Sequence, residues 1–163
     1  MFSIRELNHT HSPQVIDLIL HIQQVEFNVP VTLESQPDLQ QIERFYIEPG
    51  GNFWGAFSGD ILIGTIALIR TPEQTGVIRK MFVKKEYRGT QPGVAQELLQ
   101  TLIRYCRQQG IETIYLGTVD LLKAAMRFYE KHGFAEIPET ALPSFFPKMP
   151  VDNRFYSLSL KNQ

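Results

Sequence analysis

The sequence is poor in cysteine and has no excess of charge of either sign. Cys106 is the single cysteine, which excludes a disulfide within the chain and any metal site built from several cysteines. Lys and Arg number 16 against 17 for Asp and Glu, which argues against the basic stripe of a nucleic-acid-binding protein. The four histidines show no spacing that places two zinc ligands on one helix. We therefore expect neither a metal site nor a nucleic-acid partner.

Long apolar runs are also missing. The longest, ILIGTIALI at residues 61–69, is far shorter than the roughly 20 residues that a membrane-spanning helix needs. The first residues, MFSIRELNHT, contain no apolar core of the secretory kind. These features predict a soluble, cytoplasmic protein with no membrane partner. With 163 residues, a single domain over 1–163 is expected.

The apolar pattern and the turn residues predict an α/β (α+β) fold. Its centre is a mixed, mostly antiparallel sheet with helices on both faces, in the order β-α-α-β-β-β-α-β-α-β. Ser12 is expected to cap the first helix, and Asp120 the last one. The expected strands cover 2–7, 52–58, 60–70, 75–83, 111–118 and 153–160, and the expected helices cover 12–27, 36–46, 94–110 and 120–134.

The stretch YRGTQPGVAQELL, residues 87–99, leads from a predicted strand into a predicted helix. A helix start leaves backbone N–H groups unpaired and has a partial positive charge. Gly89 and Gly93 allow a close backbone approach, and the Arg88 guanidinium suits phosphate oxygens. The stretch therefore predicts an anion site for a phosphate or pyrophosphate; the alternative is a glycine-containing loop with an exposed arginine.

Two motifs in this order resemble the GNAT superfamily of N-acetyltransferases, which use acetyl-CoA. The family pattern, Arg or Gln followed by spaced glycines at a helix start, matches Arg88 and Gly93, and AAMRFYEKHGF at 124–134 matches the later helix. The resemblance implies that the strand at 81–83 binds the pantetheine arm and that the loop after it binds the pyrophosphate. The cofactor-binding residues implied are Met81, Phe82, Val83, Arg88, Gly89, Thr90, Gln91, Gly93, Val94, Ala95, Thr118 and Phe128.

Tyr129 is the candidate catalytic residue. A phenol O–H can protonate the departing thiolate of CoA, and the family position implies this role of general acid. The alternative from helix periodicity is a tyrosine that packs against the sheet. His132, in the last turn of the same helix, is more simply a partner of the helix dipole.

The general base has no obvious candidate on the strand at 75–83, which offers Arg79 and Lys80 but no carboxylate. Glu43, Glu48 and Glu73 are candidates from elsewhere, and a water chain or an amine that arrives neutral are alternatives. Two family positions also differ: Gln91 replaces the usual loop glycine, and Leu122 replaces an asparagine.

The acceptor is expected to be a small-molecule amine. The variable segments 24–50 and 138–153 contain aromatic residues with a cation just beyond, which suits an acceptor with a carboxylate; the alternative is that these aromatics cover the edge of the sheet. These residues are Phe27, Phe45, Tyr46, Phe145, Phe146 and Arg154. The function predicted is an acetyl-CoA-dependent N-acetyltransferase, which could form a homodimer. The alternatives are a CoA-binding sensor with weak or no catalysis and a nucleotide-binding regulatory protein.

Overall fold

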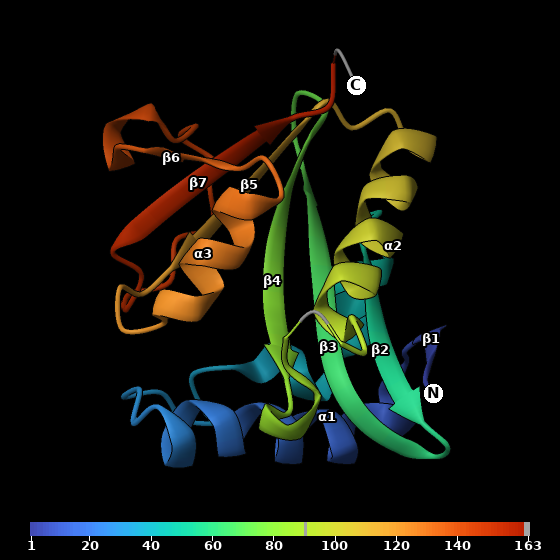
Figure 1. Ribbon diagram of the computed structural model, residues 1–163. Coiled ribbons are helices and arrows are strands. Elements are labelled where there is room, and N and C mark those ends of the chain that lie inside the picture. The colour runs from blue at the N-terminus through green and yellow to red at the C-terminus, as the bar shows by residue number, and fades with distance from the viewer. Residues whose placement is uncertain (90, 162–163) are drawn as a thin grey trace.

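A computed structural model describes residues 1–89 and 91–161 (Figure 1). Seven strands form one sheet in the order β1-β2-β3-β4-β5-β7-β6. The β4–β5 pair is parallel and the other neighbours are antiparallel, so the predicted mixed, mostly antiparallel sheet is confirmed. The strands are β1 (Ser3–Glu6), β2 (Asn52–Ser58), β3 (Ile61–Thr71), β4 (Thr75–Val83), β5 (Thr113–Thr118), β6 (Ala135–Ile137) and β7 (Arg154–Ser159).

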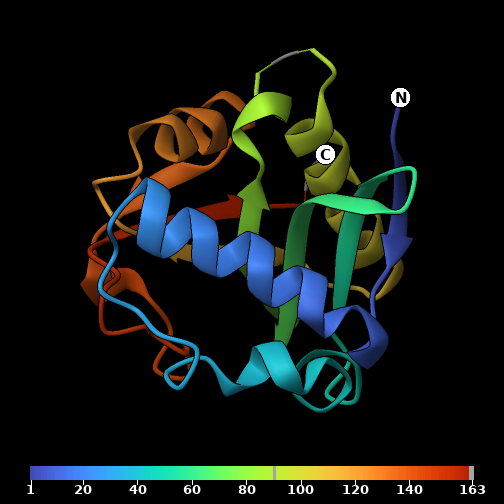
Figure 2. The same cartoon turned by 90° about the horizontal axis from the view of Figure 1, so that it is seen from below.

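Helices cover both faces of the sheet, and each face has its own apolar core. The helix α1 lies across one face together with the short helices that follow it, as the view from below shows (Figure 2). The helices α2 and α3 pack on the other face. The helices are α1 (Ser12–Leu20), α2 (Val94–Gln108) and α3 (Lys123–Lys131), with short helical turns η1 (His9–His11), η2 (His21–Glu26), η3 (Pro37–Gln40), η4 (Glu43–Ile47), η5 (Lys85–Tyr87) and η6 (Glu139–Ala141).

Apolar periodicity explains why α2 forms where it was predicted. Leu98, Leu99 and Leu102 recur at spacings of one, three and four, and all three side chains are fully buried against the sheet. Gly110 follows the helix with φ +73, the left-handed conformation that ends many helices. The helix begins on the side of the sheet where β4 ends (Figure 1).

Several sequence-based boundaries were wrong. Ser12 is the first residue of α1, not its cap, because η1 precedes the helix directly. Asp120 does not cap α3, which begins at Lys123. The predicted helix over 36–46 is two pieces, because Gln41 has a non-helical backbone between η3 and η4. The three-residue strand β6 was missed because it is too short to show an alternating pattern.

Two negative observations apply to residues 1–89 and 91–161. No three His, Cys, Asp or Glu side chains are grouped in a way that could hold a metal ion. None of the helices in this part of the chain combines the length and the apolar character needed to cross a bilayer.

Candidate active site

The sheet opens between β4 and β5. The two strands pair from Thr75 with Thr113 to Ile78 with Leu116, and then separate. β4 continues to Val83 and β5 to Thr118. Backbone groups on this edge of β4 are thus left without the neighbouring strand, and a pocket lies in the opening.

A β-bulge in β4 adds to the opening. Arg79 pairs with Ala67, and Phe82 pairs with Thr65, so that Lys80 and Met81 together face one residue of β3. Lys80 has φ +55, a left-handed conformation that a non-glycine residue rarely adopts. The Thr65 hydroxyl donates to the Lys80 carbonyl at 2.7 Å and helps to hold the bulge. The bulge changes the direction of the side chains at the point where β4 leaves β5.

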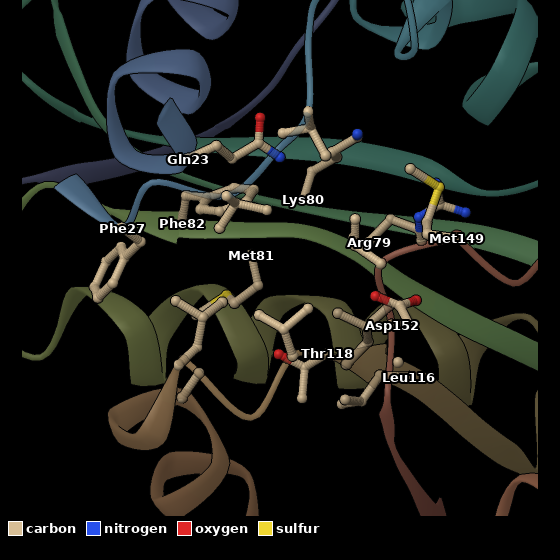
Figure 3. A pocket seen from close by; sticks show the side chains of 18 of the residues that line it. Gln23, Phe27, Arg79, Lys80, Met81, Phe82, Leu116, Thr118, Met149 and Asp152 are labelled. Carbon is tan, nitrogen blue, oxygen red and sulfur yellow. The ribbon is translucent and has the colours of Figure 1, made fainter. Parts of the chain in front are cut away.

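The pocket draws on both strands and both layers of helices (Figure 3). Met81, Phe82, Thr118 and Tyr129, all predicted site residues, line it together. Figure 3 shows Phe27 at one end, with Arg79, Met149 and Asp152 gathered at the other. Its other lining residues are Ile22, Gln23, Val29, Val31, Ile78, Lys80, Leu116, Gly117, Val119, Leu122, Ala125 and Val151.

Tyr129 lies on α3 and is almost fully buried, with 5% of its surface exposed. Its ring packs edge-on against Phe128, at 5.7 Å between centroids, and Phe134, at 5.5 Å. Burial raises the pKa of Tyr129, so that the hydroxyl keeps its proton at neutral pH. Tyr129 thus packs among aromatic side chains and also lines the pocket, and its role as general acid stays a prediction. Phe128 stacks on His132 at 4.4 Å.

The loop before α2 has the predicted glycine conformations. Gly89 has φ +103 and Gly93 has φ +84, and Gly93 directly precedes the first helical residue, Val94. The side chain of Val94 is buried and that of Ala95 is half-buried, so their backbone N–H groups are what the helix start offers to a ligand. Gln91 is exposed in this loop. Thr90 lies outside the described residues.

The Arg88 guanidinium already has partners in this structure. Its two terminal nitrogens bind the Glu26 carboxylate of η2, with Nη2 to Oε1 at 2.7 Å, and its Nε donates to the Val83 carbonyl at 2.8 Å. The hydrogen bond from Arg88 is the main cause that lowers the pKa of Glu26. The sequence did not indicate that Arg88, the arginine predicted to bind phosphate, pairs with a glutamate 62 positions away along the chain.

The carboxylates proposed as general base lie elsewhere. Glu43 pairs with His9 on the surface, with 2.6 Å from Oε2 to Nδ1, and Glu48 and Glu73 are exposed. Instead, Asp152 lines the pocket. Burial is the main cause that raises the pKa of Asp152. Sequence reasoning missed this residue because it sits in the proline-rich loop before β7 and belongs to no motif.

The predicted acceptor pocket was only partly right. Phe27 lines the pocket, whereas Tyr46 is buried behind it, donating to Asp38 Oδ2 at 2.5 Å. Arg154 pairs with Glu136 at 2.9 Å on the surface. Phe45 is exposed, and Phe146 packs edge-on against Phe155 with Phe145 half-buried nearby in the chain. The cations of the pocket are Arg79 and Lys80, both from the bulged part of β4.

Comparisons with known proteins agree with this geometry. Residues 16–134 match the model of the acetyltransferase (GNAT) family. An acetyltransferase of the GNAT family from Staphylococcus aureus superposes with a TM-score of 0.95, 42% identity, and coverage of 99% of this chain and 100% of that one. An acetyltransferase from Streptococcus agalactiae gives a TM-score of 0.93 at 30% identity, covering 98% of both chains.

Among curated proteins, N-acetylaspartate synthetase from Danio rerio is 29% identical over 126 residues, which cover 74% of this chain and 44% of that protein. A probable N-acetyltransferase family 8 member 5 from Mus musculus is 31% identical over 104 residues, covering 61% and 45%. The chain thus spans less than half the length of these two relatives. The family match over most of the chain, together with the opened β4–β5 pair, identifies this chain as a member of the acetyltransferase (GNAT) family.

Proposed function

We propose that this protein transfers the acetyl group of acetyl-CoA to the amine of a small molecule. The observation that carries the proposal is the opening between β4 and β5, which starts at the bulge and leads toward the first turn of α2. Two proteins of the same fold were solved in complexes with coenzyme A: PaiA N-acetyltransferase from Thermoplasma acidophilum, at 16% identity, and N-acetylglutamate synthase from Neisseria gonorrhoeae, at 19%. At these identities they support the fold alone.

The residues of this chain fit acetyl-CoA. The β4 backbone at Met81, Phe82 and Val83 has no β5 partner, so an extended pantetheine arm can pair with it as an added strand. The Val83 carbonyl also accepts from Arg88 Nε, which leaves it one further lone pair. The N–H groups at Gly93, Val94 and Ala95 suit the pyrophosphate, and Thr118 offers a hydroxyl on the facing strand.

In this proposal, acetyl-CoA supplies an activated acyl group as a thioester. The backbone N–H groups at the bulge hold the carbonyl oxygen and stabilise charge that develops there. Tyr129 keeps its proton until the sulfur departs and then donates it. Phe128 helps to hold the Tyr129 ring in place by edge-on packing. The deep position of Tyr129 limits competing proton transfer from water.

A thiol-release assay with acetyl-CoA and a panel of amines tests the proposal. Acetyl-CoA at about a hundredfold excess over its Kd should raise the free energy of unfolding by about 2.7 kcal/mol, which a thermal-shift measurement detects. ATP and NAD serve as comparison ligands, and a shift with these instead would support the nucleotide-binding alternative. A shift with acetyl-CoA but no thiol release with any amine would indicate a CoA-binding sensor.

The proposal also includes a cytoplasmic location without a membrane or nucleic-acid partner, which the balance of 16 basic and 17 acidic residues supports. A homodimer is part of it as well. Exposed apolar side chains on η4, Phe45 and Ile47, support such a contact. Size-exclusion chromatography with light scattering measures the assembly, and a monomer at all concentrations would contradict a homodimer.

A further inference from the structure

One end of the pocket contains a guanidinium and a carboxylate that do not pair. Arg79 from β4 and Asp152 from the loop before β7 both line this end (Figure 3). Within residues 1–89 and 91–161, neither side chain forms a salt bridge. Opposite charges that share a pocket without a salt bridge between them are complementary to a ligand with both charges.

Arg79 is held in place by groups that leave its charge unmatched. Its Nη1 donates to the Pro147 carbonyl at 3.3 Å, and its Nη2 lies 2.7 Å from the Met149 sulfur. Both partners are uncharged. A guanidinium has five N–H donors, so further donors are left for a carboxylate, the partner that its planar geometry suits best.

The Asp152 carboxylate lies close against β5 because the β5 residue beside it, Gly117, has no side chain. A Cβ atom added at Gly117 would lie 2.5 Å from Asp152 Oδ2, a distance at which one of the two must move. Glycine at this position therefore lets the carboxylate lie where β5 separates from β4. Burial raises the pKa of Asp152, while the charge of Arg79 opposes the shift. A carboxylate in these surroundings is a better proton acceptor than an exposed one.

The second cation of the pocket is already neutralised by the protein. Lys80 Nζ lies 2.5 Å from Gln36 Oε1 and 3.6 Å from Asp38 Oδ2, and only 4% of the Lys80 side chain is exposed. Asp38 also accepts from Tyr46. With Lys80 and Asp38 paired, Arg79 and Asp152 are the two charges at this end that a ligand can satisfy.

We propose that the acceptor is a zwitterionic α-amino acid with an apolar side chain, whose carboxylate binds Arg79 and whose amine binds Asp152. The inference rests on the proposed acetyltransferase function and specifies its substrate. The apolar preference follows from the neighbours of the two charges, Leu116, Met149 and Val151, which line the same pocket. Phe27, at the opposite end, lies beside Arg88 on the side of the predicted pyrophosphate loop, with 5.5 Å from guanidinium to ring.

The proton balance gives Asp152 a chemical role. An amino acid arrives as an ammonium ion, and Asp152 accepts one proton to make the nitrogen nucleophilic. The nitrogen then forms a C–N bond to the acyl carbon while the C–S bond breaks with its electron pair on sulfur. Tyr129 donates a proton to that sulfur and recovers one from the nitrogen. The products are the N-acetylated amino acid and the free thiol, and Asp152 releases its proton to solvent.

The test compares L-leucine with L-leucinamide, which has the same side chain and amine but no carboxylate. Wild-type protein should use leucine with a kcat/KM about 100-fold above that of leucinamide, the usual worth of a hydrogen-bonded charge. Arg79→Gln should remove most of this preference, mainly through KM for leucine, and should change kcat/KM for leucinamide far less than that for leucine. Arg104→Gln, an exposed arginine of α2, is the matched control and should keep the preference.

Asp152→Asn should lower kcat for both compounds, by about 100-fold, because the asparagine amide cannot accept the proton. Equal use of leucine and leucinamide by the wild-type protein overturns the inference without any variant, so a poorly folded Arg79→Gln protein does not block the test. An equal loss for both compounds in Arg79→Gln also overturns it. Turnover of polyamines or arylalkylamines but not of amino acids overturns this inference alone. If none of the amines tested causes thiol release, the proposed function is overturned as well.

Discussion

The two ends of the pocket are built in different ways. The CoA end, defined as the proposed binding residues 81–83 and the adjoining 88–89 and 91–95, offers mainly backbone groups: the edge of β4 without a β5 partner and the first turn of α2. The proposed acceptor end, defined by Arg79, Gly117 and residues 147–152, offers two charged side chains, Arg79 and Asp152, from separate segments of the chain. A site built from backbone groups needs particular residues, such as glycines, at fixed spacing along the chain. A site built from side chains needs only that segments distant in the sequence lie close together in the fold.

This difference explains why only the CoA end has a residue pattern that can be recognised in the sequence. Positive φ values of +103 and +84 require glycine at positions 89 and 93, so the loop has a recognisable pattern. Arg79 and Asp152 are 73 positions apart and satisfy no local rule. The variants below test whether the two ends are also separable in function.

The largest effect is expected for Tyr129→Phe, which keeps the ring and removes the hydroxyl. Loss of a positioned general acid should lower kcat by about 100-fold, with kcat/KM falling in parallel. The Kd for acetyl-CoA should change less than about twofold, because the packing against Phe128 and Phe134 is kept. Steady-state kinetics and isothermal titration measure the two quantities.

Tyr105→Phe is the matched control for this change. The Tyr105 hydroxyl donates to the Gly50 and Gly51 carbonyls at 2.8 and 3.1 Å, away from the pocket, so that only stability should fall. A Tyr129→Phe protein with normal kcat and weaker CoA binding would make Tyr129 a positioning residue. Because burial raises the pKa of Tyr129, its titration should lie above the pH range of an ordinary rate profile, and no high-pH limb is expected from it.

Gly93→Val should damage the CoA end selectively. At φ +84 a β-branched residue is strained by about 1–2 kcal/mol, and its side chain would stand at the helix start. We expect the Kd for acetyl-CoA to rise at least about tenfold. Gly110→Val is a close control, because Gly110 has φ +73 at the other end of α2 with open space around it. Both variants should lose similar stability; an equal effect on Kd would show that strain, not position, weakens binding.

The mixed, mostly antiparallel sheet and the long helix α2 could be predicted from the sequence, because both depend on local apolar periodicity. The residues expected to bind CoA came from the two motifs that resemble the family, and their role stays a prediction. Asp152, the residue proposed here as general base, could not be found in this way. Glu43, Glu48 and Glu73 were considered because they flank predicted strands, yet each lies on or near the surface. Asp152 reaches the pocket only because β7 pairs with β5 and Asn153 N donates to the Thr118 carbonyl at 3.0 Å.

Lys80 and its partners illustrate the same limit. The lysine was visible on the predicted strand, but its bulge depends on pairing with β3, and its ion pair depends on η3 folding beneath the sheet. Arg88 was correctly placed at the loop, while its partner Glu26 lies on a short π-helix that extends α1. Long-range pairings of this kind leave no periodic signal in one sequence.

Lys80 should make the stability of the acceptor side depend on pH. Burial lowers the pKa of Lys80 from 10.5 to about 8, so between these values the unfolded chain binds more protons than the folded one. Lys80 should therefore contribute a rise in stability with pH in this window, by at most about 1.4 kcal/mol per pH unit. The Cys106 thiol, whose pKa burial raises from 9.0 to about 12, contributes a fall above its ordinary pKa, and this fall is common to the wild-type and Lys80 variant proteins. Urea unfolding between pH 7 and about 9 measures the slope, below the range in which most tyrosines of an unfolded chain ionise.

Lys80→Met should lack this rise, since methionine does not titrate. The exposed Lys123→Met variant is the control and should keep the wild-type slope. If wild-type and Lys80→Met proteins showed parallel curves, the ammonium of Lys80 would be as well solvated in the folded protein as in the unfolded one. The close contacts with Gln36 and Asp38 would then not represent a buried pair.

The smallest effect is expected at Glu26, which connects the short helix η2 to Arg88 at the CoA end. The Glu26 carboxylate holds both terminal nitrogens of Arg88, and a pyrophosphate must compete with it for the same donors. Glu26→Gln should weaken that competition and tighten acetyl-CoA binding by about threefold, the scale of a partly exposed ion pair. The gain should shrink at high salt, where exposed charges are screened.

A double-mutant cycle with Arg88→Ala separates this competition from a general change of charge. If Glu26 acts through Arg88, then Glu26→Gln should have almost no effect on the Kd once Arg88 is removed. Glu86→Gln, which removes a nearby exposed carboxylate of η5, is the control for charge alone and should change the Kd less than Glu26→Gln. A gain that persists without Arg88 would mean that the arginine supports the loop through Val83 and does not bind the phosphates. In that case the CoA end would be built from backbone groups alone, and its contrast with the acceptor end would be complete.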